Sequence, residues 1–185
     1  MAHWVSALAH PFVMVFVMVG VGTVRAGGSE DALRNLGLVA LFVIVPLTIL
    51  TVRQVRRGAW ANADASRPHE RPLLYAVGIA GTGALVFCLT VWLPDPALLR
   101  GSRVALGFLV VCAVTTRWIK VSLHVAAASL TAAALILTGS IAGWVVAGIV
   151  PLLMWSRLTL GRHTLQEVVA GVLMGIVAGV AMHFP

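Results

Sequence analysis

Long apolar segments alternate with short polar ones along the whole chain. We expect seven apolar segments with helical periods, at residues 7–24, 35–52, 73–93, 104–116, 122–138, from the turn at 139–143 to about 155, and 164–183. A helix needs about 20 apolar residues to cross the hydrocarbon core of a bilayer. The pattern therefore predicts an all-α fold, a polytopic transmembrane bundle of six or seven helices forming a single domain over residues 1–185.

Prolines and glycines indicate where these helices bend or pack closely. Pro11 near the start of the first segment is tolerable in a first helical turn. Pro46 predicts a kink in the second segment, where a neighbour must satisfy the carbonyl that proline frees. The seventh segment has small residues four positions apart that predict the close approach of another helix, namely Gly171, Gly175 and Gly179.

Composition excludes a soluble domain and gives no sign of nucleic-acid binding. Hydrophobic residues make up 60% of the chain and charged residues only 10%, with a mean hydropathy of +1.00. The net charge of +7 comes from basic residues at the ends of apolar segments, where they would meet lipid headgroups or an anionic substrate. Cys88 and Cys112 lie inside apolar runs and form no disulfide framework. Without a charged leader or cleavage site, the first segment is expected to be a retained helix.

Alternate crossings bring three polar stretches to the same side of the membrane. These are residues 53–72, 117–120 and 156–163, whereas the loops at 25–34, 94–103 and 139 fall on the other side. An ionisable cluster at membrane depth is by default a functional-site hypothesis, because charge there is expensive.

The stretch around residues 156–167 carries the most distinctive chemistry. His163 and Glu167 are four residues apart, so on a helix they share one face, where a carboxylate can orient an imidazole. Arg157 offers a planar fork suited to phosphate. Thr164 with Glu167 also fits a capping box at a helix start, and both interpretations can hold together.

The other two stretches are weaker when each is taken alone. Ser122 is a plausible helix N-cap with His124 just after it, and taken alone a capping serine and a packed histidine are the favoured interpretation. Arg67 and Arg71 would lie on one helical face and repel unless an anion sits between them, but a solvated loop is the simpler interpretation. Together, two histidines, several arginines and a carboxylate on one face favour phosphoryl transfer. No acidic cluster offers Mg²⁺ ligands, so we expect a mechanism without metal or other cofactor.

On these residues the chain resembles the type 2 phosphatidic acid phosphatase family, membrane lipid phosphatases related to vanadium haloperoxidases. That family carries three motifs: Lys-x6-Arg-Pro, Pro-Ser-Gly-His and Ser-Arg-x5-His-x3-Asp. The third motif is present as Ser156 and Arg157, five residues, His163, three residues and Glu167. Only the last position departs, from Asp to Glu.

The first two motifs are less complete. The second reads Val121-Ser122-Leu123-His124, which keeps Ser and His but lacks Pro and Gly. The first is Arg71-Pro72 with Asp64 where Lys would stand, or Arg67-Pro68 with Trp60 at that position. Which arginine belongs to the motif therefore stays open.

The resemblance implies a role for each matching residue. His163 would be the nucleophile that forms a phosphohistidine, Glu167 would orient it, and His124 would be the general acid for the leaving group. The phosphoryl oxygens would be held by Arg157 and Arg71, with Arg67 and Ser122 as further candidates. The implied activity is hydrolysis of a lipid phosphate or diphosphate, such as a polyprenyl phosphate or a phosphatidic acid-like lipid.

The side that faces the cytoplasm follows from the count of basic residues. Nine lie on the expected site side: Arg53, Arg56, Arg57, Arg67, Arg71, Arg117, Lys120, Arg157 and Arg162. Four lie on the other: Arg25, Arg34, Arg100 and Arg103. Setting aside the three expected phosphate ligands, Arg67, Arg71 and Arg157, leaves six against four. This difference slightly favours a cytoplasmic site, in a bacterial inner membrane.

Two other functions fit parts of this pattern. A non-catalytic lipid-phosphate binder or transporter would explain why the first two motifs are incomplete. A purely structural membrane protein would leave the one-sided group of histidines and arginines unexplained.

Overall fold

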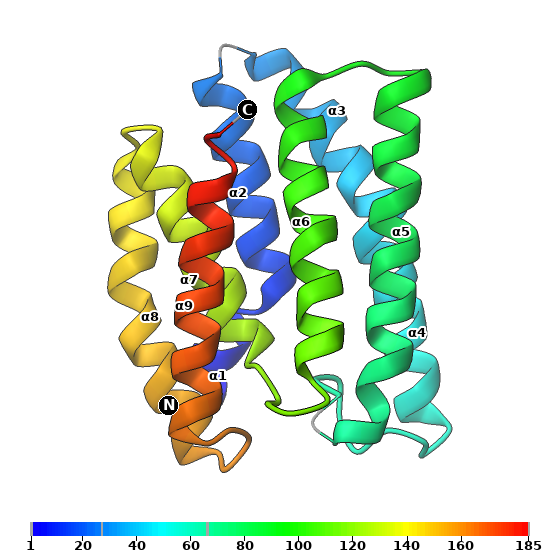
Figure 1. Ribbon diagram of the computed structural model, residues 1–185, viewed down its shortest axis with the longest axis vertical. Helices are drawn as coiled ribbons and strands as arrows, with labels where there is room; N and C mark the ends of the chain where they lie inside the picture. The colour runs from blue at the N-terminus through cyan, green and yellow to red at the C-terminus, as the bar shows by residue number, and fades with distance from the viewer. Residues whose placement is uncertain (1, 27, 66, 185) are drawn as a thin grey trace. The chain divides into compact units, whose positions relative to one another are not determined.

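The computed structural model describes residues 2–26, 28–65 and 67–184, and all regular elements within them are helical. This confirms the all-α prediction. In chain order the elements are α1 (Ala2–Leu8), α2 (Pro11–Arg25), α3 (Ser29–Val39), the π-helical turn η1 (Ala40–Ile44), α4 (Val45–Arg56), the 3₁₀ turn η2 (Pro68–Glu70), α5 (Arg71–Val91), α6 (Pro96–Thr115), α7 (Leu123–Leu137), α8 (Ile141–Thr159) and α9 (Leu165–Ala181) (Figure 1).

Four helices are long and apolar enough to cross a membrane: Glu30–Arg56, Arg71–Val91, Pro96–Thr115 and Ile141–Thr159. The first combines α3, η1 and α4. Only 17% of its most apolar window is buried inside the protein, so most of this surface suits lipid rather than a protein core. Three shorter apolar helices are α2, α7 and α9. The chain is therefore suited to an integral membrane protein, with four candidate spans among the described residues.

Several predicted segments begin at the wrong residue, and capping explains why. The first segment was expected from residue 7, but α1 ends at Leu8 and a new helix begins at Pro11. The residue before a proline disfavours helical backbone, and His10 is accordingly extended, with φ −61° and ψ 142°. Likewise α6 begins at Pro96 rather than near residue 104, because Asp95 caps it by accepting a hydrogen bond from the Leu98 N–H at 2.8 Å.

The chain divides into two compact units. One holds α1, α2, the first part of α3 up to Asn35, and everything from Ile119 onward; the other is Leu36–Trp118. That the whole chain acts as one domain stays a prediction.

In the first unit α7 is the central helix. It packs against α2, α8 and α9, and most of its residues are buried. The glycines of α9 make this packing possible, because a Cβ on Gly175 would overlap the Ala126 carbonyl and lie 2.8 Å from the Ser129 Cβ. Cβ atoms on Gly171 and Gly179 would meet the same helix. The close approach predicted from the glycine spacing is confirmed.

In the second unit α5 packs against α6, α4, η1 and η2. Near Pro46, where a kink was predicted, the structure has the π-helical turn η1, which ends two residues before the proline and leads into α4. Proline has no N–H for the carbonyl four residues earlier, which belongs to Phe42. Gly81 of α5 approaches this carbonyl so closely that a Cβ there would overlap it.

Candidate active site

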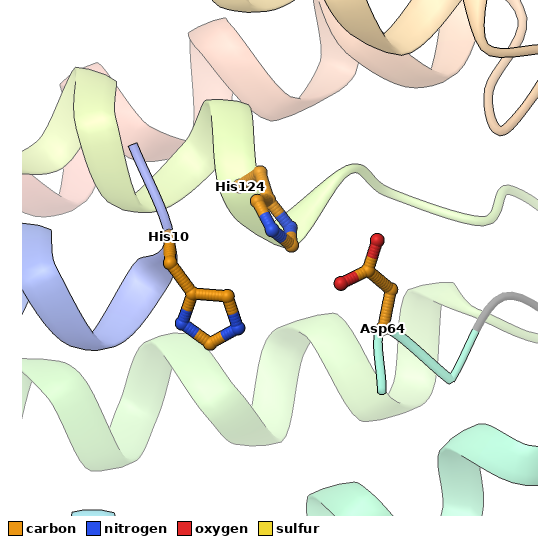
Figure 2. Close-up of side chains that lie close together, drawn as sticks. All are labelled: His10, Asp64 and His124. Carbon is orange, nitrogen blue, oxygen red and sulfur yellow. The ribbon is translucent and has the colours of Figure 1, made fainter. Parts of the chain in front are cut away.

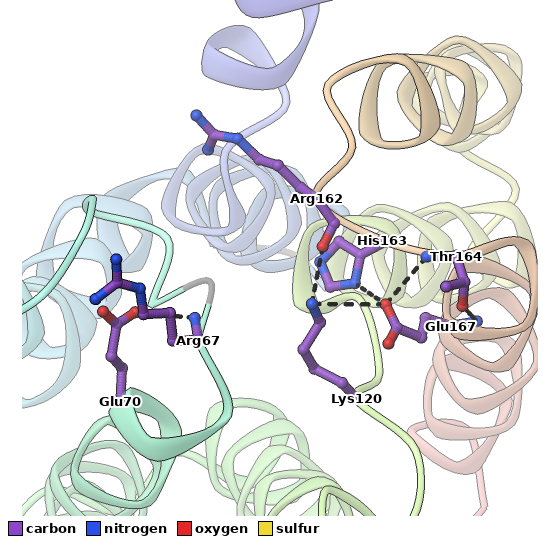
Figure 3. Close-up of polar contacts among 7 residues, drawn as sticks. All are labelled: Arg67, Glu70, Lys120, Arg162, His163, Thr164 and Glu167. Carbon is purple, nitrogen blue, oxygen red and sulfur yellow. Dashed lines mark hydrogen bonds and ion pairs between the residues drawn. The ribbon is translucent and has the colours of Figure 1, made fainter.

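The helix N-terminus of α9 holds His163 and Glu167 in contact. His163 lies in the loop before α9 and is 8% exposed. Its Nδ1 is 2.9 Å from Oε2 of Glu167, and the same carboxylate oxygen accepts the Thr164 N–H at 3.1 Å (Figure 3). The Thr164 hydroxyl accepts the Glu167 N–H in return, which completes the capping box. The predicted capping box and the predicted contact are therefore confirmed, although His163 precedes the helix instead of lying on it. The cap holds the carboxylate beside the ring.

This contact decides the tautomer of the neutral His163 ring. A carboxylate can only accept, so Nδ1 carries the proton and the neutral ring has its lone pair on Nε2. A carboxylate behind an imidazole also raises its basicity. The pair is therefore arranged as an oriented base or nucleophile.

Lys120 is a cation at this site that the sequence analysis did not single out. Its Nζ donates to the Arg162 carbonyl at 2.9 Å and lies 3.8 Å from Oε2 of Glu167 (Figure 3). The only sequence signal was its place in the short basic stretch at residues 117–120. Lys120 links the segment before α7 to the loop before α9 and shares the carboxylate with His163.

The start of α7 lies beside the start of α9. The Ser122 N–H donates to the Glu167 carbonyl at 3.2 Å. Ser122 occupies the N-cap position, as expected, but its side chain makes no capping hydrogen bond. The buried Ser122 hydroxyl has no hydrogen-bond partner among the described residues. His124, two residues later, is 5% exposed.

Arg157 lies in the last turn of α8 and is 1% exposed. Its Nη1 donates to the Ser6 hydroxyl of α1 at 2.8 Å. The following chain returns close to this turn, since the Arg162 N–H donates to the Arg157 carbonyl at 3.2 Å. The arginine expected to bind phosphate is thus buried in the same unit as both histidines.

A third histidine, His10, also belongs to this part of the unit. Its ring packs edge to face on His124, with centroids 5.1 Å apart and planes at 83° (Figure 2). Burial, and then the charge of Arg157, lower the pKa of His10 from its usual 6.5. The sequence analysis missed His10 because 114 positions separate it from His124, and only its place before Pro11 marked it.

Arg67, Glu70 and Arg71 lie in the second unit. Glu70 is 1% exposed, and its carboxylate accepts the Ala61 N–H at 2.8 Å and the Arg67 N–H at 3.0 Å. Arg71, the first residue of α5, is 2% exposed, whereas the Arg67 side chain is exposed. Arg67 precedes η2, so the expectation that both arginines share one helical face is wrong. Their convergence with the histidines stays a prediction.

Compared with known proteins, the chain matches no family model, no curated protein and no solved structure. The resemblance to a phosphatase family therefore depends on the motif residues described above.

Proposed function

We propose that this protein is a membrane phosphatase that hydrolyses the phosphate or diphosphate of a lipid through a phosphohistidine, without a metal ion. The observation that carries the proposal is the 2.9 Å contact between Nδ1 of His163 and Oε2 of Glu167. It favours the tautomer whose nucleophilic lone pair is on Nε2, and the His163 side chain is buried. Phosphoryl transfer has two other requirements. The Arg157 guanidinium would bind the phosphoryl oxygens, and His124 would donate a proton to the leaving group.

The proposed reaction has two balanced steps. In the first, Nε2 of His163 bonds to phosphorus, the bond from phosphorus to the leaving oxygen breaks, and His124 protonates that oxygen. In the second, water attacks the phosphohistidine, His124 takes the water proton, and the bond to Nε2 breaks to release inorganic phosphate. Arg157 stabilises the charge on the phosphoryl oxygens in both steps. Arg71, Arg67 and Ser122 are proposed as further ligands of these oxygens.

A lipid substrate is favoured by where the charges and the apolar surface lie. Four candidate spans place much of the chain in a bilayer, and Arg157 lies at the end of one of them. A lipid tail can then stay among apolar helices while its phosphate reaches the helix ends. Polyprenyl phosphates or diphosphates and phosphatidic acid-like lipids both meet this requirement.

Release of inorganic phosphate tests the proposal. The purified protein in detergent micelles is given dioctanoyl phosphatidic acid or farnesyl diphosphate, with and without a chelator. We expect turnover that the chelator leaves unchanged, and His163→Ala should abolish it. His183→Ala is the matched control, because His183 lies just beyond the other end of α9, where its Nε2 contacts the Ala134 carbonyl. No turnover by the wild type, or equal turnover by His163→Ala, would contradict the proposal.

A non-catalytic lipid-phosphate binder or transporter is the second candidate. It is favoured by the incomplete motifs, with Asp64 or Trp60 in place of a lysine and Leu123 in place of a glycine. A wild type that binds lipid phosphate in micelles but releases no inorganic phosphate would establish this alternative.

We also propose that α2, α7 and α9 complete the membrane bundle, which gives up to seven crossings. These helices have 15 to 17 residues, about 22–26 Å at 1.5 Å per residue. That is shorter than a hydrocarbon core of about 30 Å. Their neighbours would have to cover the remaining depth. We further propose that the protein lies in a bacterial inner membrane and that its site faces the cytoplasm.

A further inference from the structure

The end of α4 carries a group of three arginines. Arg53 and Arg56 lie in its last turn, and Arg57 is its C-cap. Residues three and four positions apart are neighbours on a helix surface, so Arg53 lies beside both of the others and their like charges repel. All three side chains are exposed, and none of them makes a hydrogen bond or an ion pair with another residue that the structure describes. A bound anion would relieve this repulsion.

An apolar groove adjoins the arginine group. Its volume is about 230 Å³, and its exposed walls are almost entirely apolar. It is lined by Thr51, Val52, Val55, Arg56 and Ala63. An apolar cavity of about 150 Å³ can hold benzene, so the groove has room for several carbon atoms. Arg56 belongs to both features, and an arginine can lay its methylene stem along apolar surface while its charge stays outside.

The groove forms because the chain turns back at the end of α4, within the second unit. Gly58 has a φ of +69°, a left-handed conformation that glycine adopts without strain. The Trp60 N–H then donates to the Gln54 carbonyl at 3.2 Å, and the Trp60 side chain is buried. The returning chain brings Ala63 to the groove as its wall opposite α4.

The place of the groove along α4 suits a lipid. Arg56 is the last residue of the candidate span Glu30–Arg56, and Thr51 lies five residues before it. Val52 and Val55 are 42% and 38% exposed, so this side of the helix offers apolar surface. A phospholipid beside the helix would meet the arginines with its phosphate and the groove with a tail.

Two features oppose an anion here, and the arginines outweigh both. The C-terminal end of a helix carries about −0.5 of an elementary charge. The stretch at residues 53–72 also contains two carboxylates, Asp64 and Glu70. The same stretch contains five arginines, so positive charge stays in excess.

We propose that the end of α4 binds an anionic phospholipid of the surrounding membrane, with its phosphate at Arg53, Arg56 and Arg57 and part of one tail in the groove. Phosphatidylglycerol represents this class. Its phosphate is a diester without a terminal phosphoryl group, so this lipid is bound and not hydrolysed. The proposal therefore goes beyond the phosphatase activity and does not depend on it.

Calorimetry on the purified full-length protein in detergent micelles tests the arginines. The ligands are dioctanoyl phosphatidylglycerol, dioctanoyl phosphatidylcholine and glycerol phosphate. Arg53→Gln/Arg56→Gln removes two charges and keeps residues that favour helix. Arg100→Gln/Arg103→Gln is the matched control, because it removes two exposed arginines, also three positions apart, from α6.

A second pair of variants tests the groove without changing any charge. Ala63→Leu fills the groove from its exposed wall, and Ala59→Leu changes an exposed residue outside it. Melting temperatures without ligand show whether each variant is folded, and we expect all four variants to melt like the wild type.

We expect the wild type to bind phosphatidylglycerol at least tenfold more tightly than the other two ligands. A basic residue near an anionic lipid surface contributes roughly fivefold, so Arg53→Gln/Arg56→Gln should lose about twentyfold in affinity. Ala63→Leu should lose about fivefold, and both controls should bind like the wild type.

Four results would overturn the proposal. They are equal binding of the two lipids, equal losses in the two arginine pairs, wild-type binding by Ala63→Leu, and equal binding of glycerol phosphate, which would indicate a site for free phosphate. Selective lipid binding by a protein that releases no inorganic phosphate would sustain the lipid site and reject the phosphatase. Turnover of phosphatidic acid without selectivity for phosphatidylglycerol would do the reverse.

Discussion

Glu167 has three contacts that set up the candidate nucleophile. Its Oε2 contacts Nδ1 of His163, accepts the Thr164 N–H and lies 3.8 Å from Nζ of Lys120. The cap holds the carboxylate in place, and the carboxylate then fixes the histidine tautomer. The step from Asp to Glu in the motif is compatible with this geometry, because the longer side chain reaches back to the helix start as a capping box requires.

Glu167→Gln separates the cap from the charge. Gln also completes capping boxes, so the melting temperature should change little, whereas His163 loses the carboxylate that orients it. We expect kcat for dioctanoyl phosphatidic acid to fall about a hundredfold. Glu167→Asp should recover part of it, and Gln166→Ala, at an exposed neighbour, should have no effect. Wild-type kcat in Glu167→Gln would remove Glu167 from the mechanism.

The lowered pKa of His10 predicts a pH dependence of stability. As pH falls through about 6.5, His10 takes up a proton in the unfolded protein, while the folded protein resists it because of burial and the charge of Arg157. The folded state therefore loses stability relative to His10→Asn between that pH and the lower folded pKa. His124, which faces His10, is present in both proteins. Melting temperatures from pH 7.5 to pH 5 check this, and a constant difference between the two proteins would contradict it.

The elements owe their boundaries and contacts to prolines and glycines. Pro11 separates α1 from α2, Pro46 accompanies the π-helical turn, and the α9 glycines let α7 approach. In a membrane the hydrophobic effect does not drive helices together, so such close backbone packing carries much of the association.

Gly81→Ala tests this packing within the second unit. The added methyl group would overlap the Phe42 carbonyl, so one helix must shift, and we expect a loss of roughly 1–3 kcal/mol of stability. Gly83→Ala, two residues along α5, meets nothing within 4 Å and should be neutral or stabilising. Thermal unfolding in detergent compares the two. Equal melting temperatures would mean that the approach to Phe42 is not tight.

For the molecule as a whole, the distribution of basic residues predicts its orientation in the membrane. Without the three expected phosphate ligands, the expected site side has six basic residues and the other side has four. This difference slightly favours a cytoplasmic position for the residues that join α4 to α5. A single cysteine at exposed Ala63 tests this, and one at exposed Ala97, beyond the other end of α5, is its matched control. Cys88 and Cys112 are buried, so background labelling should be low. In intact cells an impermeant thiol reagent should label Ala97→Cys and spare Ala63→Cys. The opposite pattern would reverse the orientation.

Local patterns in the chain were sufficient to predict the helices and the contact between His163 and Glu167. Apolar runs make helices because a backbone in lipid must satisfy its own hydrogen bonds. The short spacing also lets His163, just before α9, contact Glu167 in its first turn. Helix starts were predicted less well, since a cap such as Asp95 acts at a single residue within polar sequence. Only the folded chain brings Ser6 to Arg157 and His10 to His124. Folding likewise brings Lys120 to Glu167, the partner of His163. These contacts join positions up to 151 residues apart, and no periodicity along a chain records which helix ends pack together.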